Sequence, residues 1–168
     1  MSRRAAILGL GRRGEAWAAL CLQAGWLVRS FDPAPGTASA VARLPGLTPA
    51  GTISGAVRDV DLVVCSVPDR LELIQMVLKR VQAEVGPATV VAVPSSSYDA
   101  EALQSCSIRP AQIIRLAQAD ADGVAYNVTD RNGPDMRRQA ELLSAELAAV
   151  LGFGQGEVED QGWDAESA

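Results

Sequence analysis

Three glycines near the N-terminus, Gly9, Gly11 and Gly14, are spaced as G-x-G-x-x-G in the segment GLGRRG. This segment follows the apolar residues 4–8 and precedes a helical pattern, so a strand would turn directly into a helix. In such a turn the first glycine permits a tight bend, the second lets the backbone approach a pyrophosphate, and the third lets helix and strand pack closely. The N–H groups and the positive dipole end of the helix then attract phosphate oxygens.

An acidic residue accompanies this loop. Asp32 closes the next apolar run, residues 26–31, where its carboxylate would accept hydrogen bonds from the hydroxyls of an adenosine ribose. The carboxylate would repel a 2′-phosphate, which predicts NAD rather than NADP as the cofactor. In the alternative interpretation the glycines only shape a turn and Asp32 caps a loop. The loop residues that we expect at the phosphates are Gly9, Leu10, Gly11, Arg12, Arg13 and Gly14.

The two arginines of the loop have two interpretations. Arg12 and Arg13 either donate charge-assisted hydrogen bonds to the phosphates or point into solvent.

The elements that position these residues alternate between strand and helix. Apolar runs predict strands at 4–8, 26–31, 61–67, 89–93, 111–116 and 124–128. Helical spacing or capping signals predict helices after Gly11, near 37–43, after Pro68, after Ser96 and from Gly133 to Leu151. Repeated strand–helix units with right-handed crossovers predict an α/β fold, a single Rossmann-type, doubly wound, mostly parallel sheet with helices on both faces. We expect this domain to occupy residues 1–153 and an acidic tail to occupy 154–168.

Composition narrows the function classes. The chain has 168 residues, of which 48% are hydrophobic, enough for the core of one domain. Its net charge of −5 is carried by acids in the last dozen residues, and the balanced remainder indicates no nucleic-acid surface. No apolar run approaches the roughly 18 residues of a membrane span, so we expect no membrane partner. Three widely separated cysteines are typical of a reduced, cytoplasmic protein.

Four segments resemble the NAD-binding domain of the 3-hydroxyacyl-CoA dehydrogenase family, and within it the carnitine dehydrogenase branch. They are AAILGLGRRGEAWAALCLQAGWLVRSFDPAPG, DLVVCSVPDRLEL, AVPSSSYDAEAL and RPAQIIRLA. The resemblance spans nearly all of residues 4–160. It implies that Val67 and Pro68 line the nicotinamide side and that Ser96 matches the serine that hydrogen-bonds the substrate oxygen. Ser96 and Asp99 also form S-x-x-D, a capping box for the following helix, so a capping role for Ser96 is the alternative interpretation.

The sequence departs from the family where catalysis would occur. The resemblance places the catalytic histidine after Arg115-Leu116, but Ala117 stands there and the chain contains no histidine. The glutamate that orients this histidine would fall near 127–129, where no acid stands. Hydride transfer from an alcohol needs a base with a pKa near 7, and Asp120 and Asp122, the acids nearest the expected place, are poor bases unless burial raises their pKa.

Several functions therefore stay open. The family also carries a helical C-terminal domain that completes the substrate pocket and mediates dimerisation, and this sequence ends where that domain would begin. We favour an NAD(H)-binding domain without independent turnover. The main alternative is an NAD-dependent 3-hydroxyacyl-CoA or carnitine-like dehydrogenase, completed by a second copy or a partner chain. An inert relic of the fold is a third interpretation. The β-hydroxyacid dehydrogenases start similarly, but they need a later lysine, and none follows Lys79.

Overall fold

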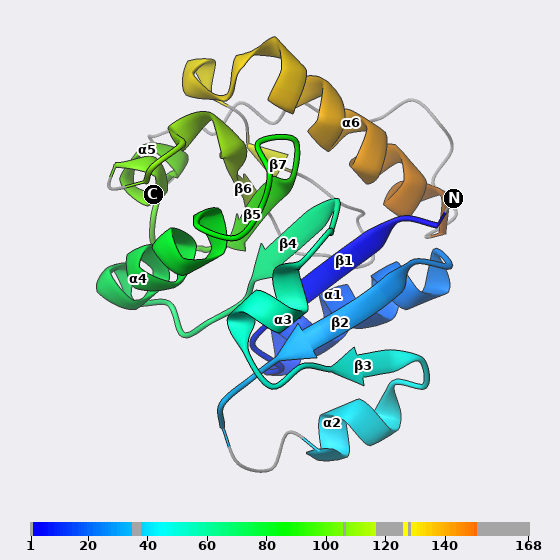
Figure 1. The fold of residues 1–168 in the computed structure, drawn as a ribbon. Helices are drawn as coiled ribbons and strands as arrows, with labels where there is room; N and C mark the ends of the chain where they lie inside the picture. Colours follow the sequence, from blue (N-terminus) through cyan, green and yellow to red (C-terminus); the bar gives the residue numbers. More distant parts are fainter. Residues whose placement is uncertain (1, 35–37, 106, 117–125, 128, 151–168) are drawn as a thin grey trace.

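The computed structural model describes residues 2–34, 38–105, 107–116, 126–127 and 129–150 (Figure 1). Within these residues seven strands form one sheet in the order β3-β2-β1-β4-β5-β6-β7. All neighbours pair in parallel except β7, which runs antiparallel to β6. The strands are β1 (Arg4–Leu8), β2 (Leu27–Phe31), β3 (Leu47–Pro49), β4 (Leu62–Cys65), β5 (Val90–Pro94), β6 (Ile113–Leu116) and β7 (Tyr126–Asn127). The predicted doubly wound, mostly parallel sheet is confirmed.

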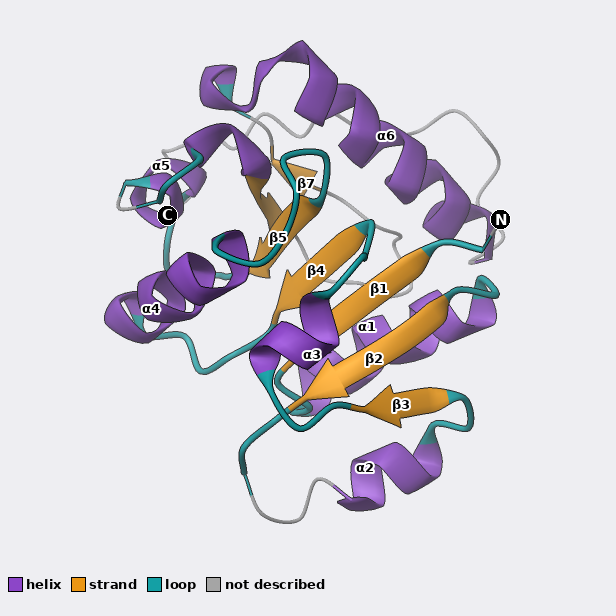
Figure 2. Cartoon of the chain, viewed as in Figure 1, coloured by secondary structure: helices purple, strands orange, loops and turns teal. Residues whose placement is uncertain are grey.

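Helices cover both faces of this sheet (Figure 2). One apolar cluster joins alternate strand residues such as Ala5 and Ile7 to α1, α2 and α6, and the other joins Ala6 and Leu8 to α3, α4 and α5. This alternation follows from the strand period of two, because successive side chains point to opposite faces. The helices are α1 (Arg12–Gln23), α2 (Ala38–Arg43), α3 (Ile53–Val57), α4 (Leu71–Gln82), α5 (Ala100–Gln104) and α6 (Gly133–Val150), with short 3₁₀ turns η1 (Pro110–Gln112) and η2 (Asp130–Asn132).

The strand order reverses between β1 and β4. From β1 the chain passes to β2 and β3 on one side and then returns to β4 on the other. In folds of this kind, ligands bind at the carboxyl ends of the strands where the order reverses. The glycine loop follows β1, and Ser66, Val67 and Pro68 follow β4. The fold thus brings the segments 9–14 and 66–68 to one edge.

Polar side chains fix the start of β6 against the end of α4. Arg109 donates from Nη2 to the carbonyls of Gln82 and Val85, both at 2.9 Å, and from Nε to Gln112 at 3.2 Å. Gln112 in turn donates to the carbonyl of Thr89 at 2.9 Å. Gln82 is the last residue of α4, so its bond satisfies a helix-end carbonyl that has no partner within the helix. The Arg-Pro segment therefore positions β6 beside β5.

Two short elements between residues 44 and 60 were not predicted. The strand β3 has three residues and the helix α3 has five, so neither is long enough to show a hydrophobic period. Strand β3 is specified instead by its pairing with β2, in which Leu47 lies opposite Val28. The expected acidic tail, together with Ala117, Asp120 and Asp122, lies outside the described residues.

Candidate functional site

Packing within the protein requires glycine at two positions of the phosphate-loop motif. Gly9 has a φ of +92°, and a Cβ there would lie 2.1 Å from the carbonyl oxygen of Ser66 in the loop after β4. A Cβ on Gly14 would lie 1.8 Å from the carbonyl oxygen of Gly9. The first glycine thus lets the two loops meet, and the second lets α1 pack on the turn. Both roles agree with the sequence prediction.

No such packing reason exists for Gly11. It is the N-cap of α1 with an ordinary φ of −73°, and no heavy atom lies within 4 Å of the place where its Cβ would be. Gly11 supplies no side-chain cap, so the N–H groups of the first turn of α1 stay available to an external anion. The open space beside Gly11 is what a bound pyrophosphate would need. The residues therefore fit a dinucleotide.

Asp32 fastens the glycine loop to the end of β2. Its Oδ2 accepts a hydrogen bond from the N–H of Leu10 at 2.7 Å, and its Oδ1 accepts one from Ala34 at 2.8 Å. The interpretation that Asp32 caps a loop is therefore correct. A carboxylate has about four lone-pair sites, so each oxygen can accept a further bond from a ribose hydroxyl. One carboxylate can thus hold the loop and bind the ribose together.

The two arginines of the loop lie in different surroundings. Arg12 is exposed, whereas Arg13 is partly buried and its charge acts on Asp69 after β4. On the nicotinamide side predicted by the resemblance, Val67 packs against the core cluster of α3 and α4, and Pro68 is exposed. The positive charge of Arg13 is thus one cause of the lowered pKa of Asp69.

The serine-rich segment forms a turn after β5, and its ordered hydroxyl belongs to Ser95, which is buried. Ser95 Oγ donates to Asp69 Oδ1 at 2.8 Å and accepts from the N–H groups of Ser97 at 3.3 Å and Tyr98 at 3.2 Å. Ser96 is exposed beside it. The capping-box interpretation of Ser96 is wrong, because α5 begins later and its N-cap is Asp99, whose Oδ1 accepts from Ala102 at 2.7 Å.

Two charged residues that sequence reasoning did not single out hold this turn. Burial alone would raise the pKa of the Asp69 carboxyl, but hydrogen bonds from Ser97 and Ser95 and the charge of Arg13 outweigh it and lower that pKa. Arg115 on β6 is 7% exposed and donates from Nε to the carbonyl of Ser95 at 2.7 Å. The signal for Arg115 was a charge inside the apolar run IIRL, since a buried charge requires partners.

The described residues give little support for thiol chemistry, metal binding or a membrane-spanning helix. Burial raises the pKa of Cys21 and of Cys65 to about 12, which keeps both thiols protonated and unreactive. No group of three or more potential metal ligands occurs in the described part of the chain. Nor is any of the helices described there both long and apolar enough to cross a membrane.

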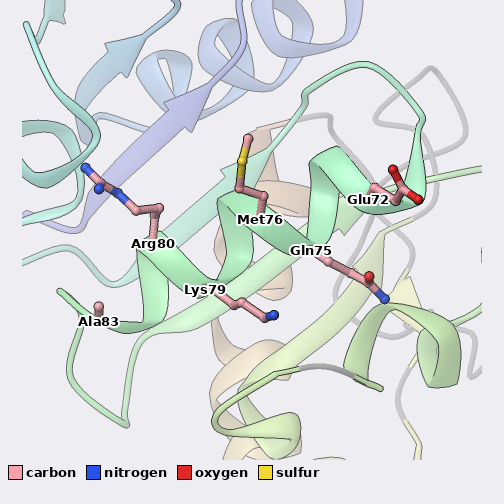
Figure 3. A pocket seen from close by; sticks show the side chains of 6 residues that line it. All are labelled: Glu72, Gln75, Met76, Lys79, Arg80 and Ala83. Carbon is pink, nitrogen blue, oxygen red and sulfur yellow. The ribbon is translucent and has the colours of Figure 1, made fainter.

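A surface hollow on the outer side of α4 is separate from this edge (Figure 3). Its lining comes from that single helix and the residue after it, and includes no residue of the glycine loop or the serine turn. The lining residues are Glu72, Gln75, Met76, Lys79, Arg80 and Ala83.

The fold and the loop geometry define a Rossmann-type dinucleotide-binding domain. A family model described as the NAD-binding domain of 3-hydroxyacyl-CoA dehydrogenase matches residues 39–117. A solved structure of (S)-3-hydroxybutyryl-CoA dehydrogenase from Ralstonia eutropha superposes with a TM-score of 0.76 over 88% of this chain and 62% of that one, at 18% identity. Residues 39–117 are thus similar to the NAD-binding domain of this family, and the solved structure shows that the chain shares its fold.

Two curated relatives are similar in sequence. The L-carnitine dehydrogenase/betainyl-CoA thioesterase of Ruegeria pomeroyi is 36% identical over 129 residues, which are 66% of this chain and 26% of that protein. The L-carnitine dehydrogenase of Streptomyces coelicolor is 30% identical over 131 residues, which are 67% of this chain and 41% of that protein. This chain therefore spans between about a quarter and two-fifths of the length of these relatives.

Proposed function

We propose that this chain binds NAD(H) at the carboxyl ends of β1 and β4, and that its own residues do not complete a hydride transfer. The observation that carries the proposal is Gly11, where glycine has no packing role and leaves open the space that a pyrophosphate needs. In this arrangement the N–H groups of residues 11–14 hold the phosphates, since those of Gly9 and Leu10 are donated to Phe31 and Asp32, and Asp32 also holds the adenosine ribose. Val67 and Pro68 line the nicotinamide side. Bound NAD would supply a hydride acceptor.

The proposal that this chain does not complete a hydride transfer is supported by the lack of a base that could take the proton of the substrate alcohol. The chain contains no histidine. Among the described groups near the nicotinamide side, the lowered pKa of Asp69 makes it a weak base at neutral pH. Ser96 is exposed and matches the substrate-binding serine of the family only by resemblance. An alcohol bound here would thus keep its proton, and a hydride would not leave it.

A dehydrogenase completed from outside residues 1–168 is the second candidate. The relatives that are 30–36% identical are dehydrogenases, and this chain covers at most 41% of them. A second copy or a partner chain would then provide the substrate domain and the base. We also propose a cytoplasmic location, consistent with Cys21 and Cys65 being free thiols.

Calorimetric titration of the cofactor-free protein with NADH and with NADPH tests the binding proposal. We expect micromolar binding of NADH and weaker binding of NADPH, because the Asp32 carboxylate repels a 2′-phosphate. The matched variant Asp32→Asn keeps an acceptor oxygen and loses the charge, so it should bind NADH more weakly and discriminate less. Binding of neither nucleotide by the wild type would refute the proposal. Oxidation of L-carnitine by the isolated chain would refute the absence of turnover.

A further inference from the structure

The outward face of α4 combines one exposed apolar side chain with charges that the fold does not pair. Met76, at the middle of the helix, is 58% exposed, although the opposite face of α4 is buried in the core. Glu72, Lys79 and Arg80 lie beside it along the surface hollow (Figure 3). Within the part of the chain that the structure describes, none of these three charges takes part in an ion pair. The charges of this face are therefore available to a group from outside.

The residues Glu72, Met76 and Arg80 follow one another at intervals of four along α4. Residues four apart are neighbours on a helix surface. With the rise of an α-helix, each neighbour in this series lies about 6 Å further along the axis. Figure 3 shows the three side chains in this order, with the methionine between the acid and the base. The stripe therefore has a negative end, an apolar centre and a positive end.

Such a stripe is complementary to itself when it is turned end over end. A two-fold axis through Met76, perpendicular to α4, would place a second α4 antiparallel to the first. Because Glu72 and Arg80 are equally far from Met76, Glu72 would then meet Arg80 of the partner subunit, and Arg80 would meet the partner's Glu72. Lys79, next to Arg80 in the chain, adds a second positive charge near the partner's Glu72. A self-complementary patch of this kind is what a closed, two-fold dimer requires.

The place of α4 in the fold leaves this contact open. The helix lies in the outer layer on one face of the sheet (Figure 2). The hollow along it is lined by α4 and Ala83, and by no residue of the glycine loop or the serine turn. A second copy seated there would leave the proposed cofactor site uncovered. A contact between two helices is smaller than the roughly 1,200 Å² of a stable interface, so the association should be weak and depend on concentration.

We propose that the outward face of α4 is the interface of a weak homodimer, in which two copies pair antiparallel about Met76, with Glu72 against Arg80 of the partner subunit. The proposal does not depend on NAD(H) binding. Exposed ion pairs are screened by salt, so the dimer should dissociate as the ionic strength rises. The NADH affinity should be the same for monomer and dimer.

Sedimentation equilibrium of the full chain at low salt, over about 10 µM to 1 mM protein, measures the association. We expect a dissociation constant on the order of 0.1 mM for the wild type. Glu72→Arg or Arg80→Glu alone brings like charges together at both symmetric contacts, and each should weaken the association at least about tenfold. An equimolar mixture of the two variants should associate within about threefold of the wild type, since each contact again joins opposite charges.

Glu141→Arg is the matched control. It makes the same change of charge at an exposed position of another helix, α6, outside the proposed interface, and should leave the association unchanged. Met76→Lys tests the centre of the interface, because it places two positive charges on the two-fold axis and should also produce a monomer. All four replaced side chains are exposed, so these variants should fold as the wild type does.

A wild type that stays monomeric at the highest concentration would overturn the proposal. Single variants that associate like the wild type, or a mixture of Glu72→Arg and Arg80→Glu that does not associate, would place any dimer on a different surface and overturn it too. Calorimetry with NADH keeps the two proposals apart. Failure of the wild type to bind NADH would refute the proposed function and leave the dimer untouched, whereas loss of NADH affinity in Glu72→Arg would contradict an interface separate from the cofactor site.

Discussion

Replacing Gly11 with alanine separates cofactor binding from folding within one loop. The added methyl group meets no atom within 4 Å and the φ of −73° suits alanine. An alanine N-cap costs about 0.5–1 kcal/mol relative to glycine. The reduced entropy of the unfolded chain returns about 0.4–1 kcal/mol. We therefore expect the free energy of unfolding to change by less than about 1 kcal/mol.

The effect of Gly11→Ala on binding should be much larger. The methyl group projects into the space through which phosphate oxygens approach the N–H groups of α1. Loss of one charge-assisted hydrogen bond costs about 1.5–3 kcal/mol, which weakens NADH binding by about 10- to 100-fold. Calorimetry with NADH measures the affinity, and urea unfolding of the ligand-free protein measures the stability.

Gly14→Ala is the matched control, because the same methyl group enters the same loop at a packed position. Alanine gains about 1 kcal/mol of helix propensity there. The Cβ, however, would lie 1.8 Å from the carbonyl oxygen of Gly9, and overpacking of this kind costs about 1–3 kcal/mol or more. We expect a clear loss of stability in the ligand-free protein. The reasoning fails if Gly11→Ala binds NADH as tightly as the wild type, or if it destabilises the protein as much as Gly14→Ala.

Three further predictions concern groups around the sheet. Because burial raises the pKa of Cys21 and Cys65 to about 12, neither thiol should react with a thiol reagent at about pH 8 in a Cys106→Ser variant. Both should react after unfolding, and labelling of the folded protein would contradict their burial. The lowered pKa of Asp69 means that its ionised form contributes stability above the ordinary value of 3.8, and that this contribution is lost as the pH falls through the folded-state pKa. Urea unfolding between about pH 3 and pH 7 should therefore show the stability gap between wild type and Asp69→Asn shrinking in acid, and a constant gap would be inconsistent with the shift. Arg109→Ala removes the donor to the carbonyls of Gln82 and Val85 and should destabilise the protein by about 2–3 kcal/mol. The NADH affinity of the folded protein should be unchanged, and an altered affinity at full stability would refute a purely structural role.

The sequence by itself determined the sheet and the first half of the site. Continuous apolar runs identified the strands that became β1, β2, β4, β5 and β6, because strands buried on both faces have no polar alternation. The G-x-G-x-x-G spacing and the acid after β2 placed the glycine loop and Asp32 together, since both depend on local order along the chain. The absence of histidine was also evident from composition alone.

Only the tertiary structure decided how the two halves of the site meet. Asp69, Ser95 and Arg115 come from segments after β4, after β5 and within β6, and their contacts depend on parallel pairing between strands that are far apart in the chain. The local S-x-x-D pattern suggested that Ser96 caps a helix. In the structure the N-cap of α5 is Asp99, so the helix begins three residues later than that pattern indicated. The three glycines show the same division. Their spacing is visible in the sequence, whereas only the packed backbone shows that the fold needs glycine at positions 9 and 14 and that no packing contact requires it at position 11.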